Sequence, residues 1–535
     1  MASQSKWILA AIRCAFLISI AAPAPAGEIL YNGIELPAPW PPADAGMKPG
    51  EPMPIPYLKE PPAVIPIDIG RQLFVDDFLI QSTTLHRVHH LAELYEGNPV
   101  VKPDQASDKA GKGSMAMPFS DGVWFDPKDQ LFKMWYIAGY MTQTAYATSR
   151  DGLHWEKPAL DVKPMTNVVH VGVRDSSTVW LDLEESDPGR RFKMWTISGP
   201  NKGWRFTLHF SPDGIHWGEP VLQTAACGDR STVFRNPFRK VWVYSLRTMG
   251  GSRARRYWEV RDLLAGPQWA QLTDATPWLG SDRLDPKRED LQVTPQLYNL
   301  DAVGYESVML GLFSIWHGDK NIPPGRPKPN SICVGYSRDG FHWDRPDRRP
   351  FIGVSESSSD WNWGNVQSVG GCCLVVGDKL WFYFSGRSGM GPKNRDAGGA
   401  TGLAFLRRDG FASMEAGAEE GSLTTRPIKF SGGHLFVNLA AASGELRVEA
   451  LGQNDTPIAP FTAENCRPLR LDKTLVAVKW NGESDLAKLA GQAVKFRFHM
   501  KSGALYSFWV TSDMNGASHG YRAAGGPGFT GNQNQ

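Results

Sequence analysis

Three aspartates occupy matching places ahead of β-rich segments. Asp175 and Asp229 each lie three residues before a Thr-Val-aromatic segment, and Asp121 directly precedes the corresponding Gly-Val-Trp segment. Carboxyl groups held in different environments can cleave a glycosidic bond, because one must carry a proton for the leaving oxygen while another is ionised. The spacing therefore indicates acid–base chemistry on a saccharide.

Other side chains near the same segment starts could hold a sugar, since aromatic faces stack on sugar rings and charged groups bind their hydroxyls. An ordinary structural reading stands beside this one: aspartates at strand starts stabilise turns, and an Asp–Arg pair can tie neighbouring blades together. The candidate substrate contacts are Arg174, Arg230, Asp285, Arg387, Trp361 and Trp363.

A Ser-x-Asp-Gly-x-His-Trp motif recurs along the chain with its aspartate at Asp151, Asp213 and Asp339, and a worn copy holds Asp409. The intervals are 62, 126 and 70 residues, so the middle one spans two units. A turn motif at a fixed period is typical of a repeat architecture, and Asp-Gly is a turn pair. We interpret these aspartates as structural residues in the hairpin turns that join the two outer strands of each unit.

Each unit reads as four short strands, with almost no helical periodicity. Five such units arranged radially predict a five-bladed β-propeller, and the cleanly alternating segments that follow predict a C-terminal antiparallel β-sandwich. The fold class is all-β. The predicted divisions are a signal peptide at 1–26, a Pro-rich arm or linker at 27–67, the propeller at 68–430, the sandwich at 431–515 and a disordered tail at 516–535.

Propeller topology decides which residues can act together. The starts of the inner strands and the loops between second and third strands share one face, whereas the Asp-Gly turns lie on the other. Asp121, Asp175 and Asp229 fall on the first face, and Glu306 falls on the second despite being a tempting acid.

Composition narrows the partners and the location. A net charge of +2 gives no reason to expect nucleic acid, and no segment after the leader is apolar enough to cross a bilayer. Lys6, the apolar run that follows it and the Ala-Pro-Ala before Gly27 predict export after cleavage near Ala26–Gly27. Oligomeric state is left open.

No metal or cofactor is predicted. His86, His89 and His90 have no obvious carboxylate partner, so we interpret them as surface or core histidines. No cysteine spacing matches zinc, and no ligand spacing in the Asp-rich segments supports a structural Ca²⁺.

The region from about residue 71 to 430 resembles the five-bladed glycoside hydrolases of the arabinanase, invertase and levansucrase group. Val173-Arg174-Asp175 is similar to the Arg-Asp-Pro motif of glycoside hydrolase family 32, whose aspartate stabilises the transition state, and the trailing sandwich is similar to that family's layout. The resemblance implies hydrolysis of glycosidic bonds.

Two motifs depart from that family. Its nucleophile motif, Asn-Asp-Pro-Asn-Gly, corresponds here to Phe119-Ser120-Asp121-Gly122, which puts Phe119 where the nucleophile would be. Its Glu-Cys acid motif has no match, and Cys227-Gly228-Asp229-Arg230 occupies that part of the third unit.

Our hypothesis is an exported carbohydrate-active hydrolase. Asp121 is the base or nucleophile, Asp175 orients substrate and stabilises positive charge, and Asp229 is the acid. The alternatives are a glycan-binding propeller without catalysis and a sialidase-like enzyme, since the Asp-Gly turns resemble sialidase Asp boxes although they are one residue shorter.

Overall fold

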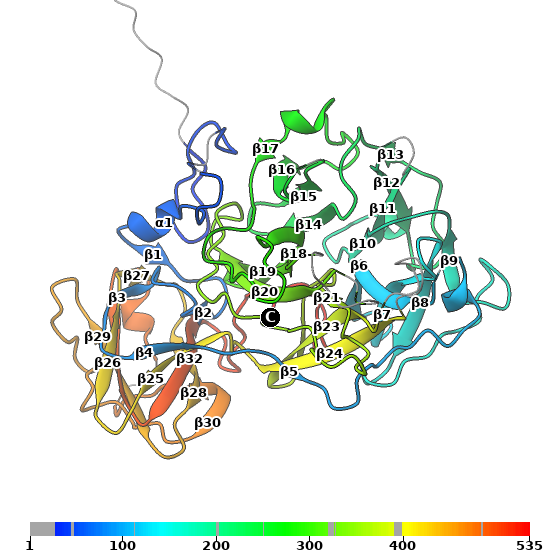
Figure 1. The fold of residues 1–535 in the computed structure, drawn as a ribbon. Coiled ribbons are helices and arrows are strands. Elements are labelled where there is room, and N and C mark those ends of the chain that lie inside the picture. The colour runs from blue at the N-terminus through cyan, green and yellow to red at the C-terminus, as the bar shows by residue number, and fades with distance from the viewer. Residues whose placement is uncertain are drawn as a thin grey trace, which may run out of the picture.

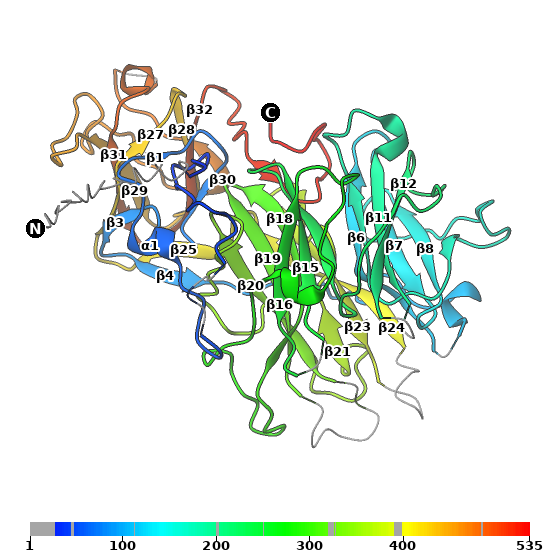
Figure 2. The ribbon, with the colours of Figure 1, turned by 90° about the horizontal axis from the view of Figure 1, so that it is seen from above.

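A computed structural model describes residues 27–43, 46, 48–111, 113–199, 203–249, 251–318, 326, 328–389, 398–482 and 485–535. The predicted signal peptide lies outside the described residues. The chain is almost entirely β-structure, as predicted, in two bodies that stand side by side (Figures 1 and 2). The helical segments of the described residues are short: α1 (Pro56–Lys59) and four 3₁₀ turns at Ser107–Lys109, Pro188–Arg190, Leu272–Asp274 and Ala487–Leu489.

The larger body consists of five antiparallel sheets, built from chain-order hairpins as the repeat predicts. The first three sheets are β6–β7–β8–β9 (Ala116–Asp126, Leu131–Ala138, Gln143–Ser149, Val168–Val171), β10–β11–β12–β13 (Ser177–Leu181, Phe192–Ser198, Arg205–Ser211, Leu222–Gln223) and β14–β15–β16–β17 (Thr232–Asn236, Val241–Arg247, Arg255–Val260, Thr276–Pro277). The fourth is β18–β19–β20 with β33 (Gln296–Glu306, Val308–Trp316, Asn330–Ser337, Tyr521–Arg522), and the fifth is β21, β22, β23 and β24 with β5 (Asn365–Gln367, Leu374–Val376, Lys379–Arg387, Gly399–Arg407, Glu93–Leu94).

The five sheets follow one another around a ring. Inner strand β6 contacts β10, β10 contacts β14, β14 contacts β18, β20 contacts β21, and β23 returns to β6. Alternate residues of each inner strand face the next sheet, and one continuous core of buried aromatic and aliphatic side chains runs through all five. The architecture is that of a β-propeller.

The repeated Asp-Gly motif forms a self-contained turn. In its third copy, Asp339 Oδ1 accepts the backbone N–H groups of Phe341 and His342, each at 2.8 Å, and Oδ2 lies 2.6 Å from His342 Nδ1. Gly340 has φ +83°, a conformation that favours glycine. The copies at Asp151 and Asp213 repeat these bonds. In all three copies the carboxylate oxygens of the aspartate form hydrogen bonds within the turn itself, which supports the structural interpretation.

Smaller-body strands form two facing sheets around a second core. One sheet holds β30, β28, β32, β25, β4 and β2 (Asp472–Ala477, His434–Ala440, Gly503–Thr511, Ala412–Ala416, His86–His89, Gln72–Leu73), and the other holds β29, β31, β26 and β3 (Glu445–Leu451, Lys495–Lys501, Gly421–Thr425, Ile80–Thr83). The predicted antiparallel sandwich is present.

The boundaries of the sandwich differ from the prediction. Strands β2, β3 and β4, which we assigned to the propeller, pair with C-terminal strands of the sandwich, and so do β25 and β26. Figure 1 shows these blue N-terminal strands among orange and red ones. The partners of β2, β3 and β4 lie more than 300 residues away in sequence, so local patterning carries no sign of their pairing.

The Pro-rich arm is tied to the body rather than free. Leu30, Leu36 and Tyr57 are buried in the sandwich core, and β1 (Ile65–Pro66) pairs with β27 (Ile428–Lys429). None of the helices within the described ranges is long and apolar enough to cross a membrane.

The predicted disordered tail is wrong. β33 pairs with β18, the Ala524 carbonyl accepts Phe125 N–H at 3.0 Å, and Val375 N–H donates to Gly525 at 2.8 Å. We predicted this C-terminal segment (residues 517–535) to be disordered, but its glycines let it cross the turns of several sheets. It covers the ring on the face of the first-to-second-strand turns.

Charged side chains join the two bodies at that same face. Glu306 is fully buried: its carboxylate accepts Arg71 N–H at 3.1 Å, Ser518 Oγ–H at 2.7 Å and Arg408 Nη2 at 3.2 Å. Arg71 also binds Asp409 at 2.9 Å. Glu306 lies on the face predicted, as a structural charge.

We expect Asp339→Ala to lower the free energy of unfolding by about 2–4 kcal/mol, because two buried N–H groups lose their acceptor. Asp151→Ala removes the same bonds from a half-exposed turn, where water replaces them, and should cost about 1 kcal/mol or less. Guanidinium denaturation of both variants measures the difference. Equal losses would contradict the assignment of the third turn as the buried one.

Glu306→Gln should lower the free energy of unfolding by about 3 kcal/mol, because it leaves two buried guanidinium groups short of a negative charge. Glu445→Gln is the matched control: its ion pairs with Arg447 and Arg470 are partly exposed, and it should change stability by about 0.5 kcal/mol. The same denaturation experiment applies. A neutral Glu306 variant would show that the network is dispensable.

Candidate functional site

A bulge in the innermost strand of the first sheet shapes the site. Met117 pairs with Ile137 and Gly122 with Trp135, so residues 118–121 of β6 stand opposite a single residue of β7. Phe119 has φ +60°, an unusual value for a bulky residue, and its N–H donates to Ser385 Oγ at 2.7 Å. The bulge turns Phe119, Ser120 and Asp121 toward the ring axis.

Asp121 is buried beside an arginine of the second sheet. Both its oxygens lie 2.9 Å from Arg174 Nη1, and the same nitrogen donates to Thr144 Oγ1. Burial raises the pKa of the Asp121 carboxyl from 3.8 to about 6, although Arg174 and Arg230 oppose the shift. The carboxylate has no exposed surface in this conformation.

A second buried carboxylate occupies the axis. Asp301 Oδ2 accepts hydrogen bonds from Ser368 Oγ at 2.6 Å, Asn299 Nδ2 at 2.7 Å and Ser120 Oγ at 3.2 Å, which come from three different sheets. Burial raises the pKa of Asp301, while the Ser368 hydroxyl lowers it. This group ties the inner strands together at the level of Asp121.

Arg230 supplies positive charge to the same region. Its guanidinium stacks on the Phe119 ring, 3.6 Å from the centroid, and is 5.7 Å from the Tyr298 ring. All three guanidinium nitrogens are buried without a hydrogen-bond partner among the described residues. Burial lowers the pKa of Arg230, and the charge of Asp175 raises it. We call Asp121, Arg174, Arg230 and Asp301 the axial charges.

Asp175 and Asp229 lie above the axial charges and are partly exposed. Asp175 Oδ1 accepts the backbone N–H of Arg230 at 3.3 Å, a direction set by the positive φ (+56°) of Arg230. Burial raises the pKa of Asp175, and the negative charge of Asp229 adds to the rise. Asp229 forms a close ion pair with Arg247. We call Asp175, Asp229, Arg247 and Arg387 the rim residues.

The two rim carboxyls differ in a useful way. Burial and the negative charge of Asp229 favour the protonated form of Asp175, whereas Asp229 forms a close ion pair with the guanidinium of Arg247. Such a pair can donate a proton to one atom of a substrate while placing negative charge near another.

The structure brings together most of the predicted site residues. Asp121, Arg174, Asp175, Asp229 and Arg230 are in contact or in electrostatic reach of one another. Arg387 joins them, with its guanidinium 5.7 Å from the centre of the Phe119 ring.

Three predicted contacts have structural partners of their own. Asp285 is buried between Arg345 (2.7 Å) and Arg348 (3.2 Å) in an ion cluster. Trp361 packs on Gly386, which directly precedes Arg387, and on Phe384, with ring centroids 5.5 Å apart in the latter pair. Trp363 is held by Arg326, whose Nε donates to its carbonyl at 3.0 Å. A role for these three residues in substrate binding stays a prediction.

Sequence reasoning missed Asp301, Tyr298 and the stacking role of Phe119. Asn299 and Asp301 alternate within an otherwise apolar strand, and two polar residues on the buried face of a central strand are a usable signal. Phe119 carries no such signal, because its position depends on the bulge.

Among the described residues, no group of three or more His, Cys, Asp or Glu side chains is arranged to hold a metal ion.

No protein-family model matches the chain, and no curated protein matches it in sequence. Solved structures do show similarity. One is a glycosyl hydrolase from Bacteroides ovatus, 14% identical over 63% of this chain and 97% of that one, with a TM-score of 0.39.

Two further structures cover more of the chain. An exo-β-1,3-galactanase from Phanerochaete chrysosporium is 10% identical over 76% of this chain and 99% of that one, with a TM-score of 0.33. A family 43 arabinoxylan arabinofuranohydrolase from Bacillus subtilis is 8% identical over 77% and 99%, with a TM-score of 0.34. All three TM-scores lie below 0.5.

The raised pKa of Asp121 gives a pH test. Its value of about 6 exceeds the ordinary 3.8, so the stability it contributes is fully present below pH 3.8 and is lost as the pH rises through 6. The free energy of unfolding of the wild type minus that of Asp121→Asn should fall by about 3 kcal/mol over this range. Urea denaturation of both chains from pH 4 to 7 measures it. A difference that grows with pH would show that Arg174 outweighs burial.

Proposed function

We propose that this chain hydrolyses glycosidic bonds in a saccharide, with the rim residues as its catalytic groups. The observation that carries the proposal is the Asp175–Asp229 pair: two neighbouring carboxyls, partly exposed on one face, of which Asp175 has a raised pKa and Asp229 is paired with Arg247. Acid-catalysed departure of a sugar needs one carboxyl that carries a proton and another that is ionised.

Asp175 is the proton donor in this scheme. It transfers its proton to the glycosidic oxygen as the bond to the anomeric carbon breaks, and Asp229 stabilises the positive charge that develops on the sugar. Asp229 then acts on the anomeric carbon directly or through a water molecule. This reverses the roles that we expected from the sequence for these two aspartates.

Asp121 takes a supporting role rather than that of nucleophile. Its oxygens are both engaged by Arg174 and are closed to solvent. As one of the axial charges it balances Arg230, whose backbone N–H orients Asp175.

The engaged state of Asp121 also favours a second candidate, a glycan-binding propeller without catalysis. In that case the rim residues would bind sugar hydroxyls, with Arg387 on one side of the binding surface. We further propose that the chain is exported, with its leader removed near Ala26–Gly27.

Sugar release from plant, algal and bacterial polysaccharides tests the proposal. Asp175→Asn and Asp229→Asn should each lower kcat by about a hundredfold to ten-thousandfold, with unchanged melting temperature. Asp187→Asn, a half-exposed aspartate in a turn between first and second strands, is the matched control and should keep full activity. Saturable glycan binding without release would favour the second candidate, and release unaffected by both variants would move the site.

The pH profile separates the two roles. Because the charge of Asp229 helps to raise the pKa of Asp175, the fall of kcat at high pH should move to lower pH in Asp229→Asn. Residual activity of that variant between pH 4 and 9 gives the measurement. An unmoved high-pH limb would mean that another group donates the proton.

A further inference from the structure

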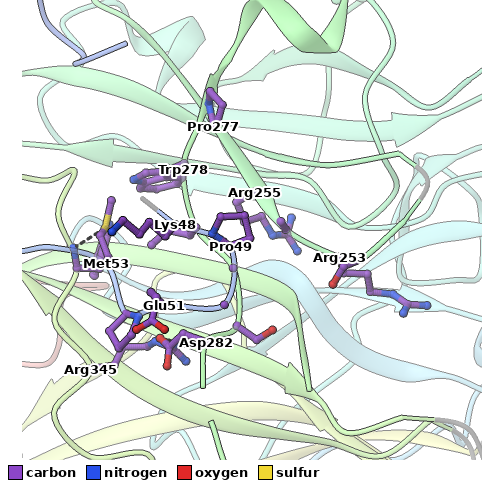
Figure 3. A pocket seen from close by; sticks show the side chains of 18 of the residues that line it. Lys48, Pro49, Glu51, Met53, Arg253, Arg255, Pro277, Trp278, Asp282 and Arg345 are labelled. Carbon is purple, nitrogen blue, oxygen red and sulfur yellow. Dashed lines mark hydrogen bonds and ion pairs between the residues drawn. The ribbon is translucent and has the colours of Figure 1, made fainter. Parts of the chain in front are cut away.

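A cavity of about 510 Å³ lies between the third and fourth sheets and is covered by the N-terminal arm. The arm contributes residues 48–53, the third sheet contributes the start of β16 and the end of β17, and the fourth contributes the segment after β20. Figure 3 shows Lys48 and Pro49 reaching across it, with Trp278 on one side and Arg345 and Asp282 on the other.

The cavity adjoins the proposed catalytic groups. Thr248 and Ser252, which line it, belong to the loop that directly follows Arg247, the partner of Asp229. Arg255, another lining residue, donates from Nη1 to the Arg230 carbonyl at 2.7 Å. The wall of the cavity therefore borders the loop after Arg247 and, through Arg255, the backbone of Arg230.

Positive charge in its wall is not balanced. Arg253, Arg255 and Arg256 form no ion pair with any carboxylate of the described residues; their guanidinium groups bind the Gln296 side chain (2.9 Å), main-chain carbonyls, and the Ala275 carbonyl (2.6 Å), respectively. Two acidic residues of the wall are engaged, since Asp282 binds Arg345 and Arg348, and Glu51 binds Arg283. The third, Asp344, forms no ion pair with the described residues, and burial raises the pKa of its carboxyl to about 6, which reduces its negative charge.

Buried arginine nitrogens remain without partners on this side of the ring. These are the Nε atoms of Arg253 and Arg255 and all three nitrogens of neighbouring Arg230. Buried polar groups are normally satisfied, so the unpartnered Nε atoms of the lining residues Arg253 and Arg255 are open to an acceptor on a bound molecule. Burial, Arg247 and Arg230 lower the pKa of Arg255 to about 9, which reflects the same crowding of positive charge.

The remaining wall is apolar and aromatic. Trp278, Trp343 and Met53 line it, together with prolines of the arm and of β17. Aromatic and aliphatic walls suit the flat faces of a sugar ring, and guanidinium groups suit an oxyanion.

From this combination we propose that the saccharide is acidic, and that the cavity holds a sugar unit bearing a carboxylate or a sulfate ester next to the bond at the rim. This inference rests on the proposed function for the bond that is cleaved. Arg253, which precedes β16, and the β16 residues Arg255 and Arg256 bind the anionic group, and the arm closes over the unit.

Isothermal titration of the full-length Asp175→Asn chain tests it, since that chain should bind without turnover. The probes are tetragalacturonate, a sulfated carrageenan tetrasaccharide and neutral galactotetraose. We expect one anionic probe to bind at least about tenfold more tightly than the neutral one, with an affinity that falls between 50 and 500 mM NaCl. Equal affinity for all three probes would overturn the inference.

Substitutions locate the binding. Arg253→Gln and Arg256→Gln, added separately, should each weaken the anionic probe about tenfold and leave the neutral one unchanged. Arg190→Gln is the matched control: a half-exposed arginine in a turn between first and second strands, which should change neither. If both Arg253→Gln and Arg256→Gln bind the anionic probe with undiminished affinity and have unchanged melting temperatures, the cavity is not the binding site.

The outcomes separate this inference from the proposed function. Preference for the carboxylate or for the sulfate probe identifies the anionic group and supports the cavity in either case. Anion-selective binding without sugar release from any substrate would refute the hydrolase and keep the cavity. Release from neutral glycans with no anionic preference would keep the hydrolase and refute the cavity.

Discussion

Burial of charge at the centre of the ring is the constraint on which the site depends. Asp121, Arg174, Arg230 and Asp301 are removed from water, and each is tolerated only because the others surround it. One of them also acts on the rim: burial and the charge of Asp229 raise the pKa of Asp175, and the guanidinium of Arg230 opposes that rise. Without the positive charge of Arg230, Asp175 would hold its proton still more tightly.

The ring must be rigid for these charges to keep their positions, and both ends of the chain provide that rigidity. β5 completes the fifth sheet from the N-terminal side, while the C-terminal segment hydrogen-bonds to the first, fourth and fifth sheets. Arg71 joins this arrangement to the sandwich through Glu306 and Asp409 and stacks 4.1 Å from the centre of the Trp509 ring. The sandwich thus braces the propeller rather than hanging from it.

Local signals predicted what local interactions determine. The Asp-Gly turns are stabilised by bonds within five residues, so their repetition indicated the sheets, and the alignment of strand starts indicated Asp175 and Asp229. What depended on distant partners was not predictable. The ion pair of Asp285 was missed because Arg345 lies 60 residues away, and the burial of Asp121 follows from a bulge that no residue pattern announces. The N-terminal strands of the sandwich pair across most of the chain.

The C-terminal segment has a consequence for how this protein is made. Residues 521–525 are synthesised after all five sheets, yet they bond to strands of three of them, and β2 must wait for β32 before it has a partner. During synthesis the early strands therefore remain unpaired while hundreds of residues emerge, a period in which exposed edges can associate wrongly. Assembly of this propeller is completed only after residues 521–525 have emerged, which makes its yield sensitive to chaperones.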